Sequence, residues 1–129
     1  MQDIEDEFAF LDDWEERYRH VIELGKAMPA LPPSLKTNDN KVQGCVSQAW
    51  LVAKRTQNEQ ISVSGDSDAH IVRGLIALLL LVVNGKTASQ ILAMDIEGFF
   101  IRIGLADNLS AQRANGLTAM IKRIRQISQ

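Results

Sequence analysis

The chain has 129 residues, 46% of them hydrophobic and 23% charged, which suits one folded domain, so we expect a single domain over residues 1–129. Its 14 basic and 16 acidic side chains give a formal net charge of −2, so no positive excess exists to neutralise nucleic-acid phosphates. The longest apolar run, residues 75–83, is far shorter than the roughly 20 residues that cross a bilayer. We therefore expect neither a nucleic-acid nor a membrane partner.

The first half of the chain predicts one helix followed by short strands. Apolar residues recur every three to four positions through residues 3–28, which indicates an amphipathic helix that Pro29 ends. Residues 41–43, 49–54 and 61–64 predict three short strands in an antiparallel meander.

Residues 65–68 have turn and N-cap composition. They precede the apolar stretch 71–83, which predicts a helix buried nearly all round that forms the centre of the core. Asp66 and Asp68 fit helix-capping residues better than partner contacts. Gly74 lies inside this helix, where glycine is costly, and so indicates close packing against another element.

The second half of the chain predicts further helices. A short helix covers residues 87–94, another begins at Asp95, and the last runs over 111–127 with Ser110 as its N-cap. The expected fold class is α+β, with a small antiparallel sheet of about three strands packed against several helices.

Cysteine occurs once, at position 45. A single cysteine excludes an internal disulfide and a metal site built from several cysteines. His20 and His70 lack ligand spacing, so we predict no metal site and no cofactor. The N-terminus is acidic where a secretory signal would be basic and then apolar. We expect a cytoplasmic setting in which Cys45 stays a free thiol.

Three sequence blocks belong together. The first is Gln43-Gly44-Cys45-x-Ser47-x-x-Trp50. The second is Gly65-Asp66-Ser67-Asp68-Ala69-x-Ile71-Val72-x-Gly74. The third is Leu109-Ser110-x-x-Arg113-x-x-Gly116-Leu117-x-x-Met120-Ile121. In this order and spacing they resemble the SufE family of sulfur-acceptor proteins, over nearly the whole chain.

The resemblance implies a SufE/IscU-like fold and a specific activity. SufE-like proteins accept sulfur from the persulfide of a pyridoxal-phosphate-dependent cysteine desulfurase (SufS-like), which they stimulate. They hold the sulfur as a cysteine persulfide and pass it to an iron–sulfur scaffold complex (SufBCD-like). Cys45 matches the sulfur-accepting cysteine of the family.

Other residues of the blocks are candidates for loop support or partner binding. Gln43, Gly44 and Ser47 flank Cys45 on a predicted turn tip, where glycine permits unusual backbone angles. Arg113 fits a structural ion pair as well as a role in stabilising this loop or docking the desulfurase. We further expect Val46, Trp50 and the 71–83 helix to form an apolar wall against which the idle loop folds.

Two other classes of function compete with the sulfur carrier. One is an enzyme proper, such as a thiol transferase or cysteine hydrolase, but neither histidine lies in a recognisable base motif. The other is a non-catalytic adaptor that binds the desulfurase or the scaffold, with Cys45 incidental.

Overall fold

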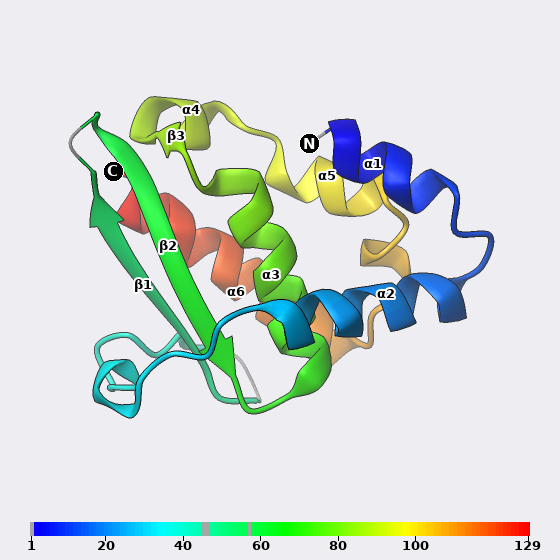
Figure 1. Ribbon diagram of the computed structural model, residues 1–129, viewed down its shortest axis with the longest axis horizontal. Coiled ribbons are helices and arrows are strands. Elements are labelled where there is room, and N and C mark those ends of the chain that lie inside the picture. The colour runs from blue at the N-terminus through cyan, green and yellow to red at the C-terminus, as the bar shows by residue number, and fades with distance from the viewer. Residues whose placement is uncertain (1, 45–46, 57) are drawn as a thin grey trace.

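The computed structural model describes residues 2–44, 47–56 and 58–129 (Figure 1). Its elements in chain order are α1 (Gln2–Ala9), α2 (Trp14–Ala27), η1 (Pro33–Leu35), β1 (Ala49–Arg55), β2 (Gln60–Ser67), α3 (His70–Val83), β3 (Lys86–Thr87), α4 (Ala88–Ala93), α5 (Ile96–Arg102), η2 (Ala106–Asn108) and α6 (Ala111–Ile127). Figure 1 shows the sheet on the left, α3 in the middle, and α1 and α2 on the right. The predicted α+β class, with a small antiparallel sheet beside several helices, is confirmed.

The sheet is antiparallel, with strand order β1-β2-β3. β1 and β2 pair from Ala49 opposite Ser67 to Arg55 opposite Ile61. The predicted turn at 65–68 is therefore wrong for its first three residues, which continue β2. A Cβ at Gly65 would lie 2.7 Å from a methyl group of α3, so this glycine allows the strand to pass close under the helix.

The strand predicted at 41–43 is found only as a short antiparallel pairing with the start of β1, in which the Val42 backbone N–H donates to the Ala49 carbonyl at 2.8 Å. Lys41 forms one isolated bridge with Trp50, and the chain then turns at Gly44. Gly44 has a φ of 93°, in the left-handed region that favours glycine, so the extended run ends there. The third strand is instead the short β3, which pairs with the start of β2.

Beyond β3, a side chain continues the pairing along β2. The Asn84 side-chain amide accepts a hydrogen bond from the Val63 backbone N–H at 2.6 Å and donates one to the Val63 carbonyl at 3.1 Å. Asn84 thus satisfies both main-chain groups of one β2 residue.

The single helix predicted over 3–28 is two helices, α1 and α2. The second begins at an N-cap, where the Asp13 carboxylate accepts a hydrogen bond from the Glu16 backbone N–H at 2.9 Å. The Glu16 side chain in turn accepts from the Asp12 backbone N–H at 3.0 Å. These reciprocal bonds favour a new helix start, and so the chain breaks at 10–13 although the apolar stripe continues across it.

Helix α3 forms the centre of the core, as predicted. Ten of its residues are buried, and α2 crosses it closely (Figure 1). A Cβ at Gly74 would overlap the Val21 carbonyl oxygen, and a Cβ at Gly25 would lie 2.6 Å from the Gly74 nitrogen. The prediction that Gly74 marks a close contact is confirmed, because only glycine fits on both sides of this crossing.

The predicted helices of the second half are confirmed with shifted ends. The Thr87 hydroxyl caps α4, the Asp95 carboxylate caps α5, and the Ser110 hydroxyl caps α6. Helix α6 lies behind α3 in Figure 1 and contacts it. Its first turns and the start of α3 meet beside the 43–48 loop, which is where the candidate site lies.

Candidate functional site

The predicted sulfur-accepting residue belongs to the 43–48 loop, between Lys41 and β1. Cys45 and Val46 themselves lie outside the described residues, but their neighbours on both sides are described. A Cβ at Gly44 would lie 3.3 Å from the Cβ of Ala119, so the loop meets α6 there. Gln43 is exposed in the turn before Gly44, beside the α6 side chains Lys122 and Arg123.

A cavity of about 280 Å³ adjoins the loop. Its lining combines an apolar wall with polar groups and comes from the loop, α3 and α6: Ser47, Val72, Leu75, Ser110, Gln112, Arg113, Gly116 and Met120. Val72 and Leu75 of the core helix therefore line a space beside the loop, whereas Val46, which was also expected in this wall, lies outside the described residues. Trp50 does not belong to this lining; it is buried beneath Lys36, whose Nζ lies 5.4 Å from the indole ring centroid.

Arg113 is exposed in the first turn of α6 and lines the cavity. Among the described residues, its guanidinium forms no ion pair, so the structure gives no support to a structural ion pair. Its backbone N–H donates to the Ser110 hydroxyl at 3.3 Å, which is the helix cap. Arg113 thus contributes a positive charge to the lining of the cavity.

The C-terminal end of the loop is held by the end of β2. Gln48 and Asp68 exchange two hydrogen bonds: the Gln48 N–H donates to the Asp68 carboxylate at 3.1 Å, and the Asp68 N–H donates to the Gln48 carbonyl at 3.2 Å. The Ser67 hydroxyl also donates to the Gln48 carbonyl, at 2.6 Å. The Asp68 side chain therefore contacts the loop.

The expectation that Asp66 and Asp68 cap α3 is wrong. The N-cap residue of α3 is Ala69, and no side chain caps this helix. The reason is positional: Asp66 lies within β2, and the Asp68 carboxylate faces the loop instead of the helix N-terminus.

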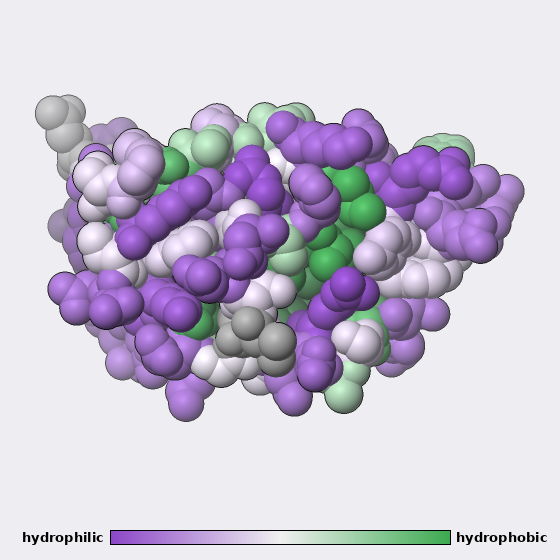
Figure 2. Space-filling model, turned by 90° about the horizontal axis from the view of Figure 1, so that it is seen from below, coloured by the Kyte–Doolittle hydropathy of each residue, from purple (hydrophilic) through white to green (hydrophobic). Residues whose placement is uncertain are grey.

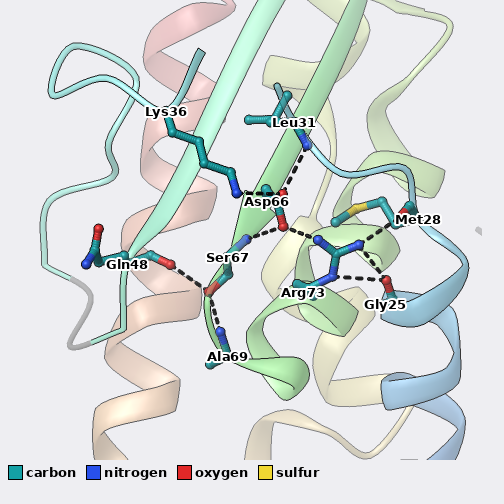
Figure 3. A network of polar contacts seen from close by, with 9 residues as sticks. All are labelled: Gly25, Met28, Leu31, Lys36, Gln48, Asp66, Ser67, Ala69 and Arg73. Atoms are coloured by element: carbon teal, nitrogen blue, oxygen red, sulfur yellow. Dashed lines mark hydrogen bonds and ion pairs between the residues drawn. The ribbon is translucent and has the colours of Figure 1, made fainter. Parts of the chain in front are cut away.

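Asp66 is the centre of a buried polar network (Figure 3). Only 1% of its surface is exposed, yet its carboxylate has four partners. It accepts backbone hydrogen bonds from Leu31 at 3.0 Å and Ser67 at 2.8 Å, pairs with the Arg73 guanidinium, and lies 3.4 Å from Lys36 Nζ. Burial alone would raise the pKa of Asp66, but the two backbone bonds, the Arg73 charge and the Lys36 hydrogen bond together lower it below its usual value.

Arg73 extends this network to the end of α2. Its guanidinium donates to the Gly25 carbonyl at 3.0 and 3.2 Å and to the Met28 carbonyl at 2.6 Å (Figure 3). The network joins α2, the 29–36 connector, β2 and α3. Sequence reasoning assigned no role to Arg73, although a lone cation in an apolar helix signals a buried partner.

The face that carries the loop is seen in Figure 2. It is largely hydrophilic, and a strip of hydrophobic surface lies among the hydrophilic side chains in the right half of the view. Within the described residues no group of three or more histidine, cysteine, aspartate or glutamate side chains could hold a metal ion. None of the described helices is long and apolar enough to cross a membrane.

Known proteins resemble the chain along almost its whole length. The SufE family, described as an Fe-S metabolism associated domain, matches residues 2–128. An uncharacterised SufE-like protein of Rhizobium etli is 55% identical over 129 residues, covering 98% of this chain and 87% of that protein. A second, from Rhizobium meliloti, is 52% identical over 128 residues, covering 97% and 91%.

Two further matches add a named relative and a solved structure. The sulfur acceptor protein CsdE of Escherichia coli is 43% identical over 117 residues, covering 91% of this chain and 80% of that protein. The solution structure of a hypothetical protein from Thermus thermophilus has a TM-score of 0.78 at 20% identity, covering 98% and 91%, which supports the fold alone. The family match over residues 2–128 and these identities show that the chain belongs to the SufE family.

Proposed function

We propose that this protein is a sulfur acceptor that takes persulfide sulfur onto Cys45 from a pyridoxal-phosphate-dependent cysteine desulfurase. It stimulates that desulfurase and passes the sulfur to an iron–sulfur cluster assembly scaffold. The observation that carries the proposal is the 43% identity to a sulfur acceptor protein over 91% of the chain, within a family associated with Fe-S metabolism. The chain has one cysteine, so Cys45 is the acceptor.

The transfer is a thiol exchange at sulfur. The Cys45 thiolate attacks the outer sulfur of the desulfurase persulfide, forming a new sulfur–sulfur bond on Cys45. The original sulfur–sulfur bond breaks, and its electron pair leaves on the desulfurase cysteine as a thiolate. The proton stays on the transferred outer sulfur, so Cys45 ends as a persulfide, and atoms and charge balance without an oxidant or reductant.

The surroundings of the loop support this chemistry. Gly44 lies against α6 and Ser47 lines the cavity, so the described residues on both sides of Cys45 support a role for this cavity in the transfer. Its apolar wall, which includes Val72 and Leu75, would shelter a bound persulfide from water and oxidants. Arg113 adds a positive charge to the lining of the cavity, and this charge would attract an anionic sulfur group that binds there.

We infer that the protein is a carrier that depends on its desulfurase partner for turnover. The similarity to a sulfur acceptor protein supports this inference. The contacts should be transient, because a carrier must leave one partner to reach the next.

The decisive measurement is the intact mass after incubation with a cysteine desulfurase and free cysteine, beside a Cys45→Ser control. The expected result is a gain of sulfur that reductant reverses and that is absent from the variant. Desulfurase turnover should also rise with the wild-type chain. If Cys45→Ser stimulates the desulfurase as well as the wild type does and neither gains sulfur, the adaptor function replaces the carrier.

A further inference from the structure

β1 is an outer strand of the sheet, and only the first half of its free edge is paired (Figure 1). The Val42 N–H donates to the Ala49 carbonyl at 2.8 Å, and the Leu51 N–H donates to the Asn40 carbonyl at 2.9 Å. Residues 38–40 form a turn, so the segment that pairs with β1 leaves the edge there. Beyond Leu51, no hydrogen bond between the described residues crosses this edge.

The register shows which main-chain groups of β1 remain open. In an antiparallel pair, alternate residues bond to the partner strand and the others face away from it. The Thr56 N–H donates to the Gln60 carbonyl, in step with the β1–β2 register, so the even-numbered residues bond to β2. The N–H and C=O of Ala53 and the N–H of Arg55 therefore point outward, as those of residues 49 and 51 do.

Positive charge surrounds this open stretch. Residues 40–58 contain three basic side chains, Lys41, Lys54 and Arg55, and no acidic one. Lys54 and Arg55 are exposed at the end of β1, and neither forms an ion pair within the described part of the chain. Because successive side chains of a strand point to opposite faces, these two place a cation on each face of the edge.

Helix α6, which contacts β1, adds further cations on this side of the sheet. Its Lys122 and Arg123 line a cavity of about 370 Å³ together with Val42, the residue that pairs with the start of β1. Arg123 donates to the Asp39 carbonyl at 2.6 Å, and α6 contains no acidic residue. Asp39 brings one exposed carboxyl group, so the surface formed by the β1 edge and α6 stays positive, with the cations Lys54, Arg55, Lys122 and Arg123.

We infer that the open edge of β1, from Leu51 to Arg55, binds an extended acidic segment of a partner protein by strand addition. The open N–H and C=O groups supply the main-chain hydrogen bonds, and the cations on both faces attract acidic side chains of the added strand. A second copy of this chain is a poor occupant, because pairing β1 with β1 would bring like charges together. The same charges that protect the edge from neutral strands thus select an acidic one.

Amide hydrogen exchange of the full chain, measured by NMR, tests the inference with a synthetic peptide. The probe is a capped peptide of about eight residues that alternates glutamate and valine, at about 1 mM because short strand pairs bind weakly. In the free chain, the amides of Ala53 and Arg55 should exchange faster than those of Val52 and Lys54, which bond to β2. With the peptide, exchange at Ala53 and Arg55 should slow by about two- to fourfold, the effect of half to three-quarters occupancy.

Two control peptides separate strand addition from general attraction. A peptide that alternates lysine and valine should give no slowing, and neither should a fully N-methylated acidic peptide, which keeps its charge but cannot donate main-chain hydrogen bonds. Equal slowing by either control, or no slowing by the acidic peptide, overturns the inference. Slowing that rises with protein concentration in the absence of peptide also overturns it, in favour of a second copy of the chain.

Variants of the chain test the same contacts from the other side. Ala53→Pro removes the outward N–H without touching the bonds to β2 and should abolish the slowing at Arg55. Arg55→Glu should abolish the slowing at Ala53, whereas Arg19→Glu, the same charge change on the exposed surface of α2, should keep it. Equal effects of these two charge reversals overturn the inference. Sulfur gain in the mass assay is a separate result, because Cys45 takes no part in strand addition.

Discussion

Replacing Asp66 with asparagine should be among the most costly isosteric changes in this protein. The change removes the charge opposite Arg73, whose side chain is only 17% exposed, and places an amide where the carboxylate accepts hydrogen bonds from Leu31 and Ser67. Breaking a buried ion pair costs about 3–5 kcal/mol. Arg73 keeps its bonds to two carbonyls, which offsets part of this, so we expect a loss of about 3 kcal/mol.

Urea unfolding at neutral pH measures this loss. With an m-value of about 1.5 kcal/mol per molar, the midpoint should fall by roughly 2 M. The matched control is Glu97→Gln, which breaks the exposed pair of Glu97 with Arg125 and should cost under about 1 kcal/mol. A loss in Asp66→Asn no larger than in this control would refute the interpretation of Asp66 as the centre of a buried network.

The same variant has a defined pH dependence. Because the pKa of Asp66 is lowered in the folded state, its contribution to stability is present above the unfolded value of 3.8 and is lost as the pH falls through the folded pKa. The difference in unfolding free energy between wild type and Asp66→Asn should be constant from neutral pH to about pH 5 and should narrow below 3.8. A difference that widens with acid would contradict the direction of the shift.

Two further predictions concern the helices. Gly74→Ala should lower the free energy of unfolding by about 3 kcal/mol or more in thermal or urea unfolding, because its Cβ would overlap the Val21 carbonyl oxygen. The control Gly85→Ala, where nothing lies within 4 Å, should lower it by about 1 kcal/mol because of the positive φ at this position. Equal losses in the two variants would contradict the close contact at Gly74. Arg113→Ala should keep the unfolding free energy within about 0.5 kcal/mol of the wild-type value and slow sulfur uptake by Cys45 several-fold in an intact-mass time course. The control is Lys122→Ala, whose side chain lies beside Gln43. Uptake in Arg113→Ala equal to that of this control would remove Arg113 from the proposed site.

Local patterns in the sequence predict most of the helices. The Ser110 cap and the buried 71–83 run are readable because capping and amphipathic periodicity act within a few residues. The break at 10–13 also had a local signal, the Asp13 and Glu16 pair, but the unbroken apolar stripe outweighed it. The two-residue strand β3 is too short for its alternation to stand out.

The residues of the candidate site can be predicted from the sequence only in part. The resemblance carried by the three sequence blocks implies Cys45 and Arg113 as candidates, and the apolar run 71–83 predicts the core helix, because each of these signals lies in one continuous segment. The role of Asp66 cannot be predicted from its sequence neighbours, because its partner Leu31 is 35 residues away. The residues next to Asp66 indicate a turn instead. Burial of a charged pair depends on tertiary contacts that no window of neighbouring residues contains.

The pairing of Asn84 with Val63 bears on how the protein behaves at high concentration. A strand edge with free N–H and C=O groups is a template on which a strand of another molecule can add. β3 covers only the first residues of β2, and the Asn84 carboxamide occupies the next pair of main-chain groups as a further strand residue would. One side chain at the end of α3 thereby blocks intermolecular strand addition at the point where the short third strand stops.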